Sequence, residues 1–527
     1  MKFRKHWAAW PVLAGLTSTC LLGCGVGLGE QSDTDARVVV GMSGSVLATD
    51  PASGYDPGSW LVFNNVFQSL LSFPNGVIEP RPEAAEKCSF TDKLVKTYRC
   101  TLKEDLKFSS GDPLTAEDVK FTFDRILRIN DPAGPAVMFH NLRSIETPDD
   151  RTVVFRLGVS DATFPSKIAS GAGAIVSRHH YDGNALRKDG KAVGSGPYKL
   201  DSFSEEEAVF SVNEGYEGPA KARNKGIRLK FFRSDRSALK EALLEGRVDL
   251  ARGLAAQDLA EMENGSGGSD VDVVEGVGME VQHLVFNMRH PVAGKLAVRK
   301  ALAHLIDRDA LVKEVHRGTA IPLYSIIPSG ITGHNTAFFD TYGAESSRTA
   351  AAAALKSGGI TDKVELTLWS TPERYGPATD RALKEIADQL NSSGLFKANV
   401  ESVPLGQYEK DIAAGKYGVY VKGWVPDYPD ADNFTAPFFG EGNVLNNHYD
   451  NDTITRTLIP RTAAESDRAG AREEFDRLQD IVARDLPLLP VWQGKQYVAV
   501  RDDIRGHQHC LDASTVFRFW ELYRRSD

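Results

Sequence analysis

Apolar residues that recur at spacings of three and four predict four helices along the chain. The first begins like a capping box at residues 115–118, with Asp118 in place of the usual Glu, before an apolar run. The apolar positions on one face of each helix are, in chain order, Val119, Phe123, Ile126 and Leu127; Leu302, Leu305 and Ile306, continued by Leu311, Val312 and Val315; Leu383, Ile386, Ala387 and Leu390; and Phe475, Leu478 and Val482. Gly318, Gly394 and Pro487 follow the last three and are typical of helix ends.

Strand patterns alternate with these helices. Val364, Leu366 and Leu368 are separated by polar residues, and so are Ile227, Leu229 and Phe231, as expected of strands with one buried face. Residues 38–40 are a continuous apolar run, residues 283–287 contain one at their centre, and both segments predict buried strands. No segment repeats at a period of 20–50 residues, which argues against a solenoid. The order of elements predicts an α/β protein.

The first residues predict export. Lys2, Arg4 and Lys5 precede an apolar run at residues 7–23 that is too short and too interrupted to span a membrane. The run ends in Leu-Leu-Gly-Cys24, which resembles the lipobox of bacterial lipoproteins. We therefore expect residues 1–23 to be a lipoprotein signal peptide, Cys24 to carry the lipid, and residues 24–36 to form a flexible tether. A plain signal peptide is the alternative.

Charge and length restrict the partners. The formal net charge is −9, and loss of residues 1–23 makes it more negative, so we expect no nucleic-acid binding. We expect contact with the membrane through the lipid only, on the extracytoplasmic face of the cell membrane. The 527 residues exceed one compact core, which predicts at least two lobes. The protein is expected to be a monomer.

Cysteine usage fits an oxidising exterior. Cys88 and Cys100 flank a predicted turn and could bridge two hairpin strands, a bond that would contribute roughly 3 kcal/mol. Two unpaired thiols are the alternative. Cys510 is left over, and we expect it to be buried.

Three common catalytic and nucleotide-binding motifs are absent from the sequence. The chain has no His-Glu-x-x-His helix, no Gly-x-Ser-x-Gly elbow and no Gly-Lys-Ser/Thr phosphate loop. Residues 507–510 place two His beside a Cys, but no second ligand group follows at a zinc-like spacing. Asp427, Asp430 and Asp432 depart from the spacing of a calcium loop. We expect neither enzyme activity, nor a cofactor, nor a metal.

Five segments in order resemble the bacterial extracellular solute-binding proteins of family 5, which serve dipeptide, oligopeptide and nickel importers. The segments are FNNVFQSLL at residues 63–71, LKEDLKFSSGDPLTAEDV at 102–119, GSGPY at 194–198, VRKALAHLIDR at 298–308 and LPLLPVW at 486–492. The second segment is the most specific, because it matches a strand, a turn and a helix start without a break. Together the matches run from about residue 38 to 510.

The resemblance implies a two-lobed, hinge-closing fold like that of type II periplasmic binding proteins, with an extra subdomain in the first lobe. On that basis residues 37–283 form lobe I, with the subdomain at about 80–193, and residues 284–494 form lobe II. Residues 495–527 return to lobe I. A ligand would be enclosed between the lobes, a preferred place for small-molecule sites.

The resemblance also implies the ligand site. In the family a strand ends in Trp-x-x-Asp, and the Asp holds the ligand's α-ammonium group; here the Asp is Asp427. The same match implies that Gly423 and Val425 pair with the main chain of an extended peptide, and that Trp424 and Tyr428 wall the pocket. The alternative is that Asp427 caps a turn and Trp424 fills the core.

The resemblance does not assign a residue to the ligand carboxylate. Oligopeptide-binding members can have an Arg two residues before the Gly-Trp pair, where this chain has Val421. Lys422 lies beside it, and strand alternation predicts that its side chain points to the opposite face.

The sequence thus predicts an extracellular lipoprotein that captures short peptides and delivers them to the permease and ATPase of an ABC importer. The alternative keeps the fold and changes the solute to a metal chelate, a sugar or a signalling peptide.

Overall fold

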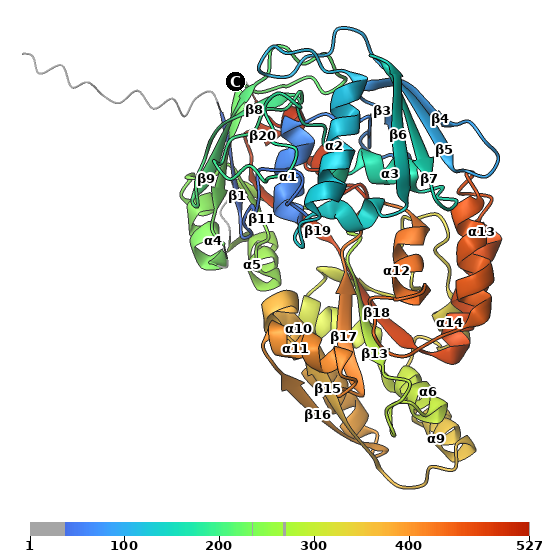
Figure 1. Cartoon of the computed structure of the whole chain (residues 1–527). Helices are drawn as coiled ribbons and strands as arrows, with labels where there is room; N and C mark the ends of the chain where they lie inside the picture. The colour runs from blue at the N-terminus through green and yellow to red at the C-terminus, as the bar shows by residue number, and fades with distance from the viewer. Residues whose placement is uncertain (1–36, 234, 267–269, 526–527) are drawn as a thin grey trace, which may run out of the picture. The chain divides into compact units, whose positions relative to one another are not determined.

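The structure is a computed structural model that describes residues 37–233, 235–266 and 270–525. Most strands belong to three sheets (Figure 1). In spatial order the seven-stranded sheet contains β12 (Val271–Gly276), β19 (Gln496–Arg501), β11 (Leu250–Arg252), β1 (Val38–Met42), β10 (Gly226–Phe231), β9 (Glu207–Val212) and β8 (Tyr198–Phe203). The six-stranded sheet contains β14 (Ala320–Pro322), β18 (Leu488–Gly494), β13 (Val281–Phe286), β17 (Val419–Trp424), β15 (Val364–Ser370) and β16 (Phe396–Ser402).

A smaller four-stranded antiparallel sheet follows the order β4 (Ala85–Phe90), β5 (Thr97–Leu102), β7 (Thr152–Leu157) and β6 (Leu142–Asp149). Cys88 and Cys100 face each other in the β4–β5 register and form a disulfide. Two short ribbons pair β2 (Leu71–Ser72) with β3 (Arg81–Pro82), and β20 (Ile504–Arg505) with β21 (Tyr523–Arg524). The Cys510 thiol is buried and unpaired, and donates to the Arg518 carbonyl.

Helices cover these sheets. They are α1 (Pro57–Val66), α2 (Ala116–Ile129), α3 (Phe164–Ala169), α4 (Arg236–Leu244), α5 (Ala256–Glu261), α6 (Leu296–Leu305), α7 (Arg308–Leu311), α8 (Ala337–Tyr342), α9 (Arg348–Ser357), α10 (Pro372–Ser392), α11 (Leu405–Ala413), α12 (Ala436–Phe439), α13 (Ile459–Ala464) and α14 (Arg472–Asp485). Among the residues with described structure, none of these helices is long and apolar enough to cross a membrane. The mixture of helices and sheets is the predicted α/β class.

All four predicted helices are present. At the start of α2, the Asp118 carboxylate accepts the Thr115 backbone N–H at 3.0 Å, so the shorter acid completes the capping box. The helix predicted at residues 302–315 is broken where expected, since Asp307 caps a new helical segment by accepting the Ala310 N–H. The third helix, α10, begins well before its apolar stripe, at Pro372.

Separate hydrophobic cores support the two large sheets. The fully buried members of the core around the six-stranded sheet all lie between Met279 and Trp492. The core around the seven-stranded sheet draws on both ends of the described chain, from Val38 to Leu522. Chain ends therefore meet in one sheet, which includes the blue β1 and the green β9 in Figure 1, while the middle of the chain builds most of the other, which includes the orange β15, β16 and β17.

The chain crosses between the two large sheets twice, from β12 to β13 and from β18 to β19. The two crossings touch. Gly494 donates its N–H to the Glu280 carbonyl at 2.9 Å, and the Gln493 amide donates to the Gly278 carbonyl at 2.7 Å. A Cβ on Gly278 would lie 2.1 Å from the Gly494 carbonyl oxygen, so this contact requires glycine.

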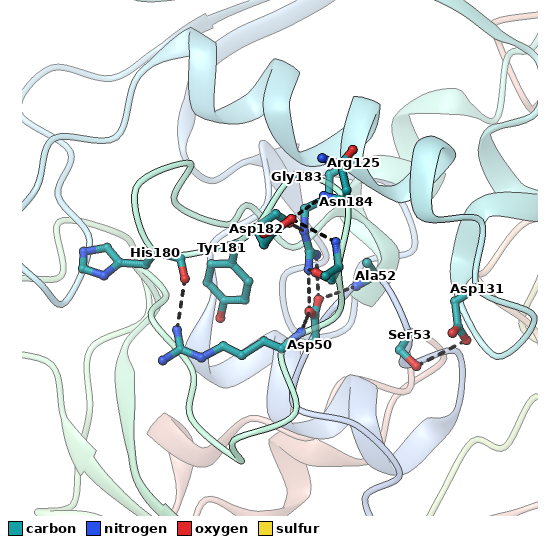
Figure 2. Close-up of polar contacts among 12 residues, drawn as sticks. Asp50, Ala52, Ser53, Arg125, Asp131, His180, Tyr181, Asp182, Gly183 and Asn184 are labelled. Atoms are coloured by element: carbon teal, nitrogen blue, oxygen red, sulfur yellow. Dashed lines mark hydrogen bonds and ion pairs between the residues drawn. The ribbon is translucent and has the colours of Figure 1, made fainter.

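A buried ion pair anchors the loop that precedes α1 (Figure 2). The Asp50 carboxylate accepts both terminal nitrogens of Arg125, at 2.8 and 2.6 Å, and both side chains are almost fully buried. It also accepts the backbone N–H groups of Ala52 and Arg187. Arg125 in turn donates to the carbonyls of Asp182 and Ala185. Each carboxylate oxygen thus accepts two hydrogen bonds and each guanidinium nitrogen donates at least one, the condition under which a buried charge is tolerated.

Candidate functional site

A cleft of about 890 Å³ is bordered by residues from both large sheets and from the two crossings between them. Its lining from the first part of the chain includes Tyr55, Trp60 and Arg252. Further lining comes from Arg374, Tyr375 and Glu409, from residues 422–427, from the crossing residues Gly278, Glu280 and Gly494, and from residues 514–517. The wall thus combines segments that are distant in sequence, as ligand sites between lobes do.

Strand β17 delivers residues 423–427 to this cleft. On one side β17 pairs with β13 along its whole length, from Val419 to Trp424. On the other side its pairing with β15 ends at Tyr420. The Val421 carbonyl accepts the Tyr408 hydroxyl on that second side, and alternate residues of a strand direct their main-chain groups the same way. The main-chain groups of Gly423 therefore face the side on which no strand follows in the described structure.

Asp427 follows this strand after Val425 and Pro426, and two neutral groups hold its carboxylate. Its carboxylate accepts the Tyr55 hydroxyl at 2.7 Å and the Asn433 amide at 3.1 Å. The Asn433 carbonyl oxygen accepts the Asp427 backbone N–H at 3.0 Å and the Trp424 indole N–H at 2.9 Å. In the part of the chain that the structure describes, no basic side chain lies within ion-pair distance of Asp427. The carboxylate is therefore oriented but not neutralised.

Burial dominates the electrostatics of Asp427. Desolvation raises the pKa of this carboxyl above its usual value of 3.8, and the hydrogen bonds from Tyr55 and Asn433 only partly oppose that effect. Burial, and then the same carboxylate, raise the pKa of the Tyr55 phenol, which therefore stays a donor. A cation placed beside Asp427 would favour its charged form, which is the electrostatic condition for binding an ammonium group.

The other predicted site residues divide between cleft and core. Gly423, Trp424 and Val425 line the cleft, and Val425 is 49 % exposed. Tyr428 does not line it. Its ring is 6 % exposed and joins the core of the four-stranded sheet, whose other buried members lie between Ala52 and Ile175, and its hydroxyl lies 3.3 Å from that of Thr163. The turn at Pro426 thus sends Asp427 and Tyr428 in different directions.

Lys422 differs from the expectation that it points away from the site. It lines the cleft, although only 9 % of the residue is exposed, and its ammonium lies 3.1 Å from Glu409. Arg374 binds the same carboxylate at 2.8 Å. Alternation along β17 does place Lys422 on the other side from Gly423, but its long side chain reaches the cleft wall through Glu409.

No pattern in the sequence predicted several of the residues that line the cleft. Tyr55 lies 372 positions before Asp427, so no local pattern links the two. Arg252 and Arg374 sit at the end of β11 and in the first turn of α10, where neither periodicity nor a motif marks them. The early start of α10, before its apolar stripe, is the one local sign that its first turn does something other than fill the core.

The remaining predicted sites lie elsewhere. Cys24 is outside the described residues. Cys88 and Cys100, joined in the four-stranded sheet, are not part of the cleft lining. Within the described ranges, His, Cys, Asp and Glu side chains do not gather in groups of three that could hold a metal.

Comparison with known proteins places this geometry in context. Residues 79–446 match the family described as bacterial extracellular solute-binding proteins, family 5 Middle. A dipeptide-binding protein of Pseudomonas aeruginosa is 24% identical over 519 residues, which cover 92% of this chain and 95% of that protein. Heme-binding protein A of Haemophilus influenzae is 24% identical over 506 residues, covering 90% of this chain and 88% of that one.

Solved structures share the fold. The periplasmic binding protein DppA of Helicobacter pylori, in complex with the peptide STSA, superposes with a TM-score of 0.77 at 23% identity, over 93% of this chain and 98% of that chain. At this identity the likeness establishes the fold alone and does not identify the ligand.

Proposed function

Because the chain belongs to the bacterial extracellular solute-binding proteins of family 5, which are binding proteins and not enzymes, we propose that it captures short peptides and delivers them to the permease and ATPase of an ABC importer. The proposal rests above all on Asp427, an oriented carboxylate on the cleft wall with no cationic partner among the described residues. A free peptide amino group is the cation that such a carboxylate suits.

The main chain beside Asp427 supports a peptide over other amines. Gly423 and Val425 present main-chain groups where β17 has lost its neighbour β15, so an extended peptide can add as a strand there. Hydrogen bonds of this kind do not depend on ligand side chains, which suits a receptor for varied peptides. The Trp424 ring, held by Asn433, forms the wall next to them.

The proposal includes the division of the chain into lobes. We assign residues 37–278 and 495–527 to lobe I, with a subdomain at about 80–193, and residues 279–494 to lobe II. The boundary lies before the expected position 283, because Val281–Phe286 form β13 of the six-stranded sheet and Met279 belongs to its core. The two crossings at Gly278 and Gly494 would be the hinge, and the permease would recognise the form that is closed over the peptide.

The proposal also includes the membrane anchor. After removal of residues 1–23, lipid on Cys24 would attach the protein to the extracytoplasmic face of the membrane, where it would act as a monomer.

The test begins with the mature domain purified from its host and denatured, so that bound ligands can be identified by mass spectrometry. Calorimetry then compares wild type with Asp427→Asn, which keeps the shape and removes the charge. For a free-amine peptide, affinity should fall at least tenfold, about 1.4 kcal/mol.

An N-acetylated copy of the same peptide is the matched control. It should bind wild type and Asp427→Asn about equally weakly, because it has no ammonium group to lose. Recovery of a metal chelate, a sugar or heme, with the variant binding that solute as wild type does, would refute the peptide assignment and retain the fold.

A further inference from the structure

Arg252 occupies the cleft from the side of the seven-stranded sheet. It is the last residue of β11, where it pairs in register with Met42 of β1 and Val498 of β19. Because strands pair with it on both sides, the backbone of Arg252 is held in place. The residue is partly buried and lines the cleft that contains Asp427. The two charged groups therefore border the same space from different sheets.

The other cleft cations already have carboxylate partners. Arg374 and Lys422 both bind Glu409, at 2.8 and 3.1 Å, and Lys495 binds Glu275 at 3.0 Å. Within the described residues, by contrast, the guanidinium of Arg252 has neither an ion-pair partner nor a hydrogen-bond acceptor. It lies over the Phe517 ring, whose centroid is 4.2 Å from the guanidinium carbon.

This environment keeps Arg252 charged and available. Burial lowers the pKa of Arg252 to about 10, so the guanidinium remains protonated at neutral pH. The neighbouring Cys510 thiol does not compensate it, because burial raises the pKa of that thiol to about 12. The Phe517 ring provides a cation–π contact, and the guanidinium N–H groups have no acceptor among the described residues.

We propose that Arg252 is the receptor for a carboxylate of the bound ligand. A guanidinium with a free edge binds a carboxylate through two parallel hydrogen bonds, which fixes direction as well as charge. The inference deepens the proposed function and rests on it. Asp427 would take the ammonium group, and Arg252 would take the anionic group from the opposite wall. That anionic group is either the chain-terminal carboxylate or an acidic side chain.

The experiment measures dissociation constants of alanine peptides of two to five residues, each as free acid and as C-terminal amide, together with Ala-Glu-Ala and Ala-Gln-Ala. Wild type is compared with Arg252→Met. If Arg252 binds the chain-terminal carboxylate, amidation weakens peptide binding to wild type at least tenfold at the matching length, and Arg252→Met no longer prefers the free acid. If Arg252 binds an acidic side chain, wild type prefers Ala-Glu-Ala over Ala-Gln-Ala tenfold, and Arg252→Met loses this preference.

Arg501→Met is the matched control, since Arg501 ends the neighbouring strand β19 and does not line the cleft. It should keep every wild-type preference. Arg252→Lys keeps the positive charge but lacks the two parallel N–H donors of a guanidinium, so it should retain part of the wild-type preference for the carboxylate. It replaces Arg252→Met in the test if Arg252→Met unfolds at a lower temperature than wild type.

Two failures can be told apart. If free-amine peptides bind and depend on Asp427, yet Arg252→Met keeps both wild-type preferences, the role of Arg252 is refuted alone. If no peptide binds wild type, the proposed function fails and this inference fails with it.

Discussion

At the scale of single residues, the site depends on charges that the protein orients without neutralising. The Asp427 carboxylate accepts hydrogen bonds from two neutral donors, Tyr55 and Asn433, and the Arg252 guanidinium packs on the Phe517 ring. Groups of this kind are costly in the empty protein because they are desolvated without an opposite charge. A ligand that supplied the missing charges would recover that cost, so the proposed roles of Asp427 and Arg252 predict selectivity for zwitterions.

The pKa of Asp427 makes binding depend on pH. Burial raises that pKa above 3.8, so the carboxyl becomes protonated as the pH falls through the raised value. Peptide affinity should therefore decline on acidification, because the protonated carboxyl cannot pair with the ligand ammonium group. Tyr55→Phe removes a donor that lowers this pKa, so the decline should begin at higher pH. Calorimetry between about pH 4 and pH 8 measures both midpoints.

Tyr497→Phe is the control for this shift, because Tyr497 donates to Glu275 and does not line the cleft. It should leave the midpoint of wild type unchanged. Equal midpoints for wild type and Tyr55→Phe would contradict the assigned coupling between Tyr55 and Asp427.

At the scale of elements, the cleft wall is held by side chains that tie loops to helices. The loop from Asp50 to Asp56 carries Tyr55, and Asp50 fastens it to α2 through Arg125. Asp56 then caps α1 by accepting the Ser59 N–H at 2.9 Å. Tyr55 is thus fixed on both sides, which explains how a loop residue can reach Asp427 with a defined hydrogen bond.

Asp50→Ala should lower the free energy of unfolding by about 3–5 kcal/mol, because it leaves the buried guanidinium of Arg125 without its partner. The measurement is chemical denaturation followed by circular dichroism. Asp189→Ala is the control, since its ion pair with Arg187 lies at the surface, and it should cost at most about 1 kcal/mol. Similar losses for the two variants would contradict the structural role of Asp50.

At the scale of the whole molecule, the two large sheets are joined by crossings that touch each other. The contact between Gly278 and Gly494 leaves no room for a side chain, whereas the two hydrogen bonds beside it hold the segments in register. Bending concentrated where two short segments run together is the arrangement expected of a hinge.

Gly278→Ala should therefore lower the melting temperature and weaken peptide binding, because its Cβ would meet the Gly494 carbonyl at 2.1 Å and force both crossings to shift. Scanning calorimetry with and without peptide measures both effects. Gly406→Ala is the matched control. A Cβ there meets nothing within 4 Å, and the site lies in helix α11, so the change should be neutral or stabilising. A Gly278→Ala variant that behaves like this control would exclude a hinge at the crossing.

Local chemistry accounts for the elements that the sequence predicted. The capping box at Thr115 and Asp118, the break at Asp307 and the strand at Val364–Ser370 each depend on residues within a few positions of one another. The strand that carries Trp424 and Asp427 into the cleft was likewise visible, because its alternation and its stop at Pro426 are local.

Tertiary structure alone decided which distant groups complete the cleft. Tyr55 reaches Asp427 only because the four-stranded sheet region and the end of β17 are packed together, and the same packing buries Tyr428 instead of exposing it to the ligand. Arg252 and Phe517 meet because both ends of the described chain return to one sheet. Contacts between residues hundreds of positions apart are set by how sheets and helices pack, and no periodicity of the chain records them.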